Sequence, residues 1–137
     1  MGIDSSMGLG IAIKNPEKHV FVFDGDGNIL MNLGSLVNIG SLKAKNLVHI
    51  VFNKNSHEST GGQPTNSIKV NLKELVKKIG YKIFKINSKN SLISILQEIK
   101  KYPGSIFLLV KISTSKERSK RVSWYSKTIR DRVIKSI

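Results

Sequence analysis

Short, continuous apolar runs alternate with longer amphipathic segments along most of the chain. Four of these runs have the length and the β-branched and aromatic content of buried strands: residues 19–24, 47–52, 81–86 and 105–112. Apolar residues between the runs recur at spacings of three and four, which is the period of an amphipathic helix. This alternation is typical of a parallel sheet covered by helices, so we predict an α/β fold with a doubly wound, mostly parallel sheet.

Capping and stopping residues delimit four helices around the expected strands. The helices are expected from Asp4 or Ser5 to Asn15, from Asn28 to Ser41, from Leu72 to Ile79 and from Ser88 to Lys101. Pro16 stops the first helix, because the residue before a proline disfavours the helical region. Asn71 suits an N-terminal cap of the third helix and Gly80 suits its left-handed end. Gly8 and Gly10 are expected to let the first helix pack closely.

Composition narrows the class of protein. A chain of 137 residues is expected to form a single domain, and the absence of cysteine excludes disulfides and thiolate zinc sites. No apolar stretch approaches the roughly 20 residues of a membrane span, and no leader is recognisable, so we expect a cytoplasmic protein without membrane contact. The net charge is +14, but lysines are scattered from Lys14 to Lys135. That scatter favours a generally basic surface over a dedicated nucleic-acid site.

Two stretches do not fit the strand and helix pattern. Residues 53–67, NKNSHESTGGQPTNS, are polar and too long for a simple connection, which indicates a functional loop. After Ile112 the chain becomes basic, so we divide it into a domain of residues 1–112 and a tail of residues 113–137. Tyr125, Ile129 and Val133 in the tail predict a short amphipathic helix that docks on a neighbouring surface.

The tail also supports an alternative function, as a basic module that binds nucleic acid or an acidic protein. Its aromatic residues Trp124 and Tyr125 could stack on bases. The cations of this alternative are Lys116, Arg118, Lys120, Arg121, Lys127, Arg130 and Arg132.

One turn is a candidate anion and metal site. Ligands of an open parallel sheet bind beyond the carboxyl ends of its strands, and Gly25-Asp26-Gly27 follows the first strand there. The two glycines are expected to admit an anion close to the backbone and to adopt positive φ, while N–H groups that open the helix at Asn28 point toward it. Asp26 adds a hard oxygen suited to Mg²⁺ on a diphosphate. Gly-Asp-Gly is also common as an ordinary strand-to-helix turn.

Three segments, VFVFDGDGNILMNLGSL, KNLVHIVFN and HESTGGQPT, make the chain resemble the C-terminal cofactor-binding domain of thiamine-diphosphate-dependent decarboxylases. It looks like phosphonopyruvate decarboxylase and is also similar to the beta subunit of sulfopyruvate decarboxylase, over residues 1 to about 112. The resemblance implies the thiamine-diphosphate-binding fold, short at its N-terminus, with thiamine diphosphate and Mg²⁺ as cofactors. The implied reaction converts a small 2-oxo acid, phosphonopyruvate, into phosphonoacetaldehyde and carbon dioxide.

The resemblance also assigns cofactor residues. It makes Asp26 a metal ligand and places Gly27 and Asn28 on the diphosphate. Met1-Gly2 is similar to the segment whose bulky residue supports the bent cofactor.

At one position the chain departs from the family pattern. The family has a second Asn and then Gly where this chain has Lys54 and Asn55, and a protonated lysine cannot ligate Mg²⁺. Three alternatives follow. Asn53 or Asn55 takes the metal after a small shift, which we favour; metal binding is impaired; or the Lys54 ammonium partly replaces the cation.

The resemblance further implies catalytic residues and a partner. His57 and Glu58 lie in the His-acidic-Ser stretch that phosphonopyruvate enzymes share, although His57 could equally be a loop histidine bonded to its neighbours. The family's activating Glu comes from a separate pyrimidine-binding domain, and no segment here resembles that domain. We therefore expect a subunit or fragment that needs this domain, acts within an oligomer and does not turn over alone. A degenerate remnant without cofactor is the other alternative.

Overall fold

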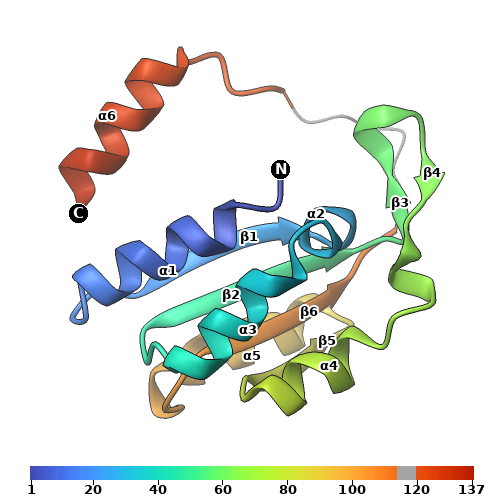
Figure 1. The fold of residues 1–137 in the computed structure, drawn as a ribbon, viewed down its shortest axis with the longest axis horizontal. Coiled ribbons are helices and arrows are strands. Elements are labelled where there is room, and N and C mark those ends of the chain that lie inside the picture. The colour runs from blue at the N-terminus through green and yellow to red at the C-terminus, as the bar shows by residue number, and fades with distance from the viewer. Residues whose placement is uncertain (114–119) are drawn as a thin grey trace.

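Four strands form one parallel sheet in the order β1-β2-β6-β5 (Figure 1). The computed structural model describes residues 1–113 and 120–137. The strands are β1 (Val20–Gly25), β2 (Leu47–Asn53), β5 (Lys82–Ile86) and β6 (Ile106–Lys111). Their bounds lie within one residue of the expected ones, and the prediction of a parallel sheet is confirmed.

Helices cover both faces of the sheet. One core cluster joins α1 (Asp4–Lys14), α3 (Leu33–Leu42) and α4 (Leu72–Ile79) to the face that carries Val22 and Phe107. A second cluster packs α5 (Lys89–Glu98) and the 3-10 turn η3 (Ile99–Lys101) against the opposite face, through Ile50 and Leu108. Figure 1 shows α5 behind the sheet and α1 and α3 in front of it. The fold is therefore doubly wound, as predicted.

The helix expected from Asn28 to Ser41 is two helices, so that prediction is wrong in one respect. A five-residue helix, α2 (Asp26–Leu30), is separated from α3 by a break at Asn32, whose φ of −146° is not helical. The Asn32 side chain donates a hydrogen bond to the Gly2 carbonyl over 2.8 Å, and its own carbonyl accepts from Ser35 N. A contact 30 residues away in the chain therefore fixes the break.

The start of α1 also differs from the expectation. Its N-cap is Ile3 without a side-chain cap, because the two candidate caps bond elsewhere. Asp4 accepts from Asn28, and the Ser5 hydroxyl is paired with that of Ser35 at 2.8 Å. Both residues thereby connect α1 to α2 and α3 instead of capping the start of α1.

Gly8 and Gly10 play different parts in α1. A Cβ on Gly8 would lie 2.2 Å from Val22 Cγ2, so glycine is needed where α1 crosses β1. A Cβ on Gly10 would meet nothing within 4 Å. Close packing is therefore confirmed at Gly8 and wrong at Gly10.

The polar stretch between β2 and α4 folds as a compact loop. It contains the antiparallel pair β3 (Ser56–His57) and β4 (Gln63–Pro64) and two 3-10 turns, η1 (Glu58–Thr60) and η2 (Asn66–Ile68). The η2 turn contacts α2 and β3 also lies near it, so the loop folds back over the start of the second helix.

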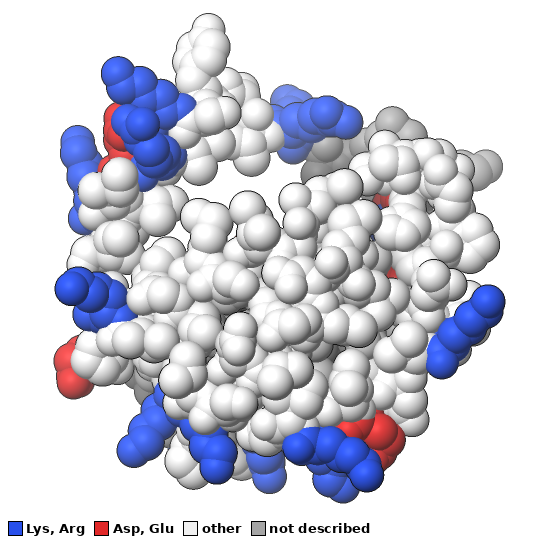
Figure 2. Space-filling view, viewed as in Figure 1, with Lys and Arg blue, Asp and Glu red and all other residues white. Residues whose placement is uncertain are grey.

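The tail ends in the expected amphipathic helix, α6 (Ser126–Ser136), which lies above α1 (Figure 1). None of its residues is buried, and Lys18 Nζ donates to the Ser136 carbonyl over 2.9 Å. Figure 2 shows Lys and Arg around the edge of the visible face, with a group of them on α6. Lys116 and Arg118 of the basic alternative lie outside the described residues. Within the described ranges no helix is long and apolar enough to cross a membrane.

Candidate functional site

A cleft of about 680 Å³ opens beyond the carboxyl ends of β1 and β2. Most of the predicted site residues line it: Met1, Gly25, Asp26, Gly27, Asn28, His57 and Glu58. Asp4, Asp24, Lys54 and Arg121 also line it, so acidic and basic side chains share the wall. The turn and the polar loop that sequence reasoning singled out therefore meet in one place.

The Gly25-Asp26-Gly27 turn admits close neighbours but does so without positive φ. Gly25 has φ −105°, and neither glycine is in the left-handed region, so the expected use of positive φ is wrong. A Cβ on Gly27 would lie 2.3 Å from His57 Cε1 and 3.1 Å from Thr65 Cγ2. A Cβ on Gly25 would meet nothing within 4 Å. Gly27 is thus required for the loop to approach the turn.

The Asp26 carboxylate is buried and held by the loop. Only 2 % of the residue is exposed, and its Oδ2 accepts hydrogen bonds from the Thr65 hydroxyl and, over 2.7 Å, from Ser67 Oγ. Its Oδ1 has a long contact of 3.5 Å from Lys54 N. Sequence reasoning missed Thr65 and Ser67, and the only available signal was their place in the polar loop that faces the turn.

A second buried carboxylate, Asp24, supports the floor of the cleft. Its Oδ1 accepts from Gly25 N and from Asn28 Nδ2, each over 2.7 Å. Its Oδ2 lies 3.2 Å from His49 Nε2, and the His49 side chain is fully buried. His49 is therefore a core residue, while His19 precedes β1 and is exposed. An acidic residue at a strand end and a histidine within an apolar strand were the signals for this pair.

Asn28 uses its side-chain amide inside the protein. Besides Asp24, its Nδ2 donates to Asp4 Oδ1 over 2.8 Å, and its Oδ1 accepts from Gly2 N over 2.7 Å. Gly2 has φ +76° and lies against Met31 and Asn32. The amide thus anchors the N-terminal segment and leaves the exposed Met1 at the cleft.

The three predicted metal ligands do not line the same hollow. Asn53 and Asn55 line a second, smaller one of about 310 Å³ at the ends of β5 and β6, beside the start of α4. Asn53 Oδ1 is buried without a hydrogen-bond partner among the described residues. Asn55 Oδ1 accepts from Ser67 over 2.9 Å, and Asn55 adopts a left-handed φ of +61°. Asparagine tolerates that conformation better than most residues, which fits a position where the family pattern has Gly.

Lys54 occupies the cleft in their place. Its side chain is largely buried and pairs with Glu58, which is about half exposed. Arg121, from the tail, lines the same cleft. Within residues 1–113 and 120–137 no group of three or more His, Cys, Asp or Glu could hold a metal ion, so a metal at Asp26 would also need ligands of other kinds, such as an amide, a carbonyl, a hydroxyl or a bound anion.

Comparisons with curated proteins give two kinds of relative. The phosphonopyruvate decarboxylase of Streptomyces viridochromogenes is 45% identical over 82 residues, which are 60% of this chain and 20% of that one. The sulfopyruvate decarboxylase subunit beta of Methanocaldococcus jannaschii is 48% identical over 81 residues, 58% of this chain and 43% of that one. The chain thus spans less than half the length of either relative.

Solved structures and a family model agree on the fold. A putative thiamin diphosphate-dependent enzyme from Mycobacterium smegmatis matches with a TM-score of 0.73 at 16% identity, covering 84% of this chain and 22% of that one. A 2-oxoglutarate:ferredoxin oxidoreductase from Magnetococcus marinus matches with a TM-score of 0.76 at 12% identity, covering 86% of this chain and 47% of that one. Residues 1–110 match the model described as thiamine pyrophosphate enzyme, C-terminal TPP binding domain. The chain therefore belongs to the family of C-terminal domains that bind thiamine diphosphate in thiamine-dependent enzymes.

Proposed function

We propose that this chain is the cofactor-binding part of a 2-oxo acid decarboxylase, with phosphonopyruvate as substrate and sulfopyruvate as the alternative. The observation that carries the proposal is the cleft in which the Gly25-Asp26-Gly27 turn and the loop with His57 converge. The two kinds of curated relative support a 2-oxo acid that carries a second, strongly acidic group.

The family's cofactor fits this cleft in part. Thiamine-dependent enzymes bind thiamine diphosphate and use Mg²⁺ in this domain. The N–H groups that open α2 face an anion favourably, and Asp26 would contribute a carboxylate oxygen to the metal. Asn53 and Asn55 line another hollow, although the Ser67 hydroxyl lies within 2.7 Å of Asp26 Oδ2 and 2.9 Å of Asn55 Oδ1. Thiamine diphosphate, when bound, supplies the electron sink for loss of carbon dioxide.

Lys54 and Arg121 are the chain's own groups for anion recognition. Both line the cleft, and a cation near an anionic substrate group is stabilising where water is partly excluded. Glu58 pairs with Lys54, and both residues line the cleft. His57 lies against Gly27, where it can hold or move a proton at the edge of the bound acid.

The pyrimidine-binding domain is the proposed partner, within an oligomer located in the cytoplasm. Three relatives are named subunit beta of sulfopyruvate decarboxylase, which fits an enzyme made of more than one kind of chain. The turn and the loop each contribute one acidic residue to this cleft, Asp26 and Glu58. Both carboxylates are already bonded within the chain, Asp26 to Ser67 and Glu58 to Lys54.

The test is carbon dioxide release from phosphonopyruvate and from sulfopyruvate, with thiamine diphosphate and Mg²⁺. The purified chain alone should be inactive, and adding a pyrimidine-domain chain should give turnover of at least one of the two acids. Arg121→Ala should raise KM for that acid with little change in kcat, because Arg121 is proposed to act on substrate binding. Full turnover by the chain alone would contradict the proposed need for a partner. An unchanged KM in Arg121→Ala would contradict the proposed role of Arg121 in substrate binding.

A further inference from the structure

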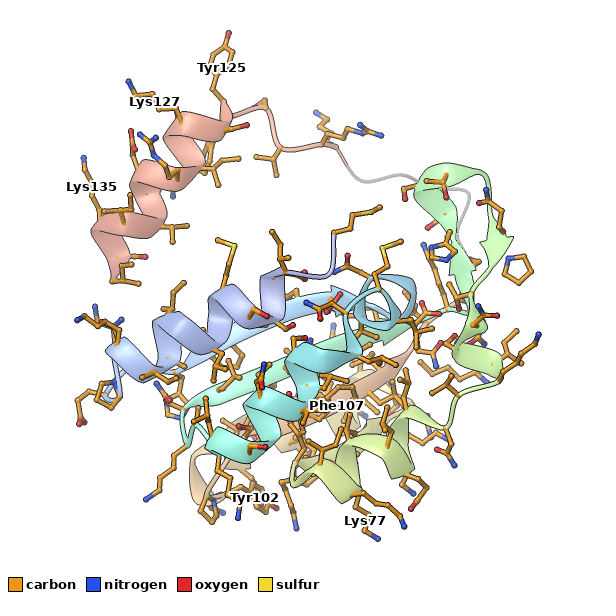
Figure 3. All side chains as sticks on the ribbon, in the orientation of Figure 1. Lys77, Tyr102, Phe107, Tyr125, Lys127 and Lys135 are labelled. Carbon is orange, nitrogen blue, oxygen red and sulfur yellow. The ribbon has the colours of Figure 1, made fainter. Side chains whose placement is uncertain are left out.

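His49 is a fully buried polar side chain that the proposed function does not use. It lies within β2 and is not among the described residues that line the cofactor cleft. Phe107, its partner in the register with β6, packs edge-on against the ring, with 5.4 Å between the two ring centroids. Figure 3 shows Phe107 among the interior side chains between the sheet and the helices in front of it. A polar ring in such an apolar place is costly unless its nitrogen atoms are bonded.

The sheet places His49 beside Asp24. In the parallel register of β1 and β2, His49 is opposite Val22 and Asp24 is opposite Val51. Alternate residues of a strand face the same side, so His49 and Asp24 are diagonal neighbours on one face of the sheet. His49 Nε2 lies 3.2 Å from Asp24 Oδ2, and both side chains are at most 1 % exposed. Little water can therefore reach this contact.

The surroundings fix the direction of this hydrogen bond. A carboxylate only accepts hydrogen bonds, so His49 Nε2 must carry the hydrogen that is donated to Asp24 Oδ2. His49 Nδ1 is buried and has no hydrogen-bond partner among the described residues. Within the part of the chain that the structure describes, the ring therefore makes a single hydrogen bond, and that bond is directed at Asp24.

Asp24 in turn holds the Asn28 side chain. The Asn28 Nδ2 group donates to the carboxylates of Asp24 and Asp4. Its Oδ1 accepts from Gly2 N. The amide cannot turn over without losing all three bonds, because carboxylates accept and an N–H group donates. Asn28 and Met1, the residue before Gly2, both line the cofactor cleft. The Asp24 carboxylate therefore sets the position of groups that face a bound ligand.

We propose that His49 is a positioning residue of the cofactor cleft, acting through Asp24 on the Asn28 amide, an inference that rests on the proposed function of the cleft. Among the described residues, Asp24 Oδ2 has no other donor. Without the Nε2–H group this oxygen would be a buried acceptor left unsatisfied, so we expect the carboxylate to turn toward water in the cleft, which Asp24 lines. Asn28 and the N-terminal segment then lose the geometry in which they meet the cofactor.

The test compares two variants of the full chain. His49→Phe keeps an aromatic ring beside Phe107 but has no N–H group, whereas His49→Gln can donate from nearly the same place as Nε2. Isothermal titration calorimetry with thiamine diphosphate and Mg²⁺, in the presence of the pyrimidine-domain chain, measures the affinity. His49→Phe should bind about tenfold to a hundredfold more weakly, as is typical when a group that orients a ligand-binding residue is lost, and His49→Gln should restore most of the affinity.

NMR of the unliganded variants separates positioning from a general loss of stability. The signals of the Asn28 side-chain amide should shift in His49→Phe and stay near those of the wild type in His49→Gln. The matched control is Asn46→Ala, because Asn46 is a buried polar residue beside the other end of β2, where its amide donates to three backbone carbonyls. This variant should be less stable but should keep the Asn28 signals and the affinity. An equal change in Asn46→Ala, or unchanged Asn28 signals in His49→Phe, would overturn the inference.

One measurement needs no variant and holds even if His49→Phe does not fold. NMR of the ring nitrogens should show that the wild-type imidazole carries its hydrogen on Nε2, and a hydrogen on Nδ1 alone would overturn the inference. If the wild type binds no thiamine diphosphate, the proposed function fails. The Asn28 signals and the position of the ring hydrogen then decide the role of His49 by themselves.

Discussion

The carboxyl edge of β1 and the helix α6 show two opposite ways of using polar and apolar groups. At the edge, the carboxylates of Asp24 and Asp26 are buried and bonded by loop, helix and strand. In α6 no residue is buried, and apolar side chains face a groove. The first region is preorganised by the chain itself, as binding sites for charged ligands require. In the second region the apolar side chains Ile129, Val133 and Ile134 stay exposed.

The largest difference in stability between the two regions is expected when the Asp24 carboxylate is removed. Asp24→Ala leaves Gly25 N, the Asn28 amide and His49 Nε2 without their acceptor, so we expect the free energy of unfolding to fall by about 3–5 kcal/mol. Urea unfolding measures it. Asp131→Ala in α6 is the control and should stay within about 0.5 kcal/mol of the wild type. Similar losses in both variants would contradict the comparison.

A pair of glycines in α1 tests how this helix packs against β1. Gly8→Ala places a methyl group against Val22 and should cost about 1–3 kcal/mol. Gly10→Ala enters open space in the middle of the same helix and should stabilise it by about 0.5–1 kcal/mol. Thermal unfolding of the two variants gives the signs, and a destabilised Gly10→Ala would mean that α1 packs differently.

A pair of glycines in the turn tests the contact between turn and loop. Gly27→Ala should push the His57 ring away at a cost of about 1 kcal/mol, the low end for overpacking, because a partly exposed side chain can move. The change should appear in the NMR signals of the His57 ring. Gly25→Ala meets no atom and should leave both the His57 signals and the stability unchanged. If the His57 signals shifted in Gly25→Ala but not in Gly27→Ala, the contact with His57 would have to be assigned to Gly25 instead of Gly27.

The smallest effect is expected at Tyr81. Burial raises the pKa of the Tyr81 hydroxyl, which has no hydrogen-bond partner among the described residues. Tyr81→Phe should therefore change stability at pH 7 by less than about 1 kcal/mol, toward greater stability. Above the ordinary tyrosine pKa of about 10, the unfolded wild type loses this proton first, so its stability falls with pH. The phenylalanine variant should not lose stability in this way. Urea unfolding of both proteins at pH 7 and at a pH above about 10 measures the difference.

The sequence predicted elements whose signals are local. Strand bounds and the Asn71 and Gly80 ends of α4 follow from apolar runs and capping residues, and the structure confirms them. The break at Asn32 was missed because apolar spacing continues across it, while its cause is a bond to Gly2. Thr65 and Ser67 reach Asp26 across some 40 residues of chain, which spacing alone does not reveal.

The departure at Lys54 shows the same limit. The sequence left three alternatives for the second metal ligand. Asn53 and Asn55 line a different hollow from Asp26, and Lys54 lines the cleft. The Ser67 hydroxyl nevertheless contacts both Asp26 and Asn55, and Asn53 Oδ1 has no hydrogen-bond partner among the described residues, so the shifted asparagine stays a prediction. Which groups complete the coordination of the metal therefore depends on the geometry of the loop rather than on residue type.

We propose that Asp26 and its turn anchor thiamine diphosphate. Isothermal titration calorimetry with thiamine diphosphate and Mg²⁺ tests it directly, on the full chain with and without a pyrimidine-domain chain. We expect wild type and Asp131→Asn to bind alike, and Asp26→Asn, shown to be folded by circular dichroism, to bind at least about tenfold more weakly because a charged metal ligand is lost. Unchanged affinity in Asp26→Asn would contradict the account.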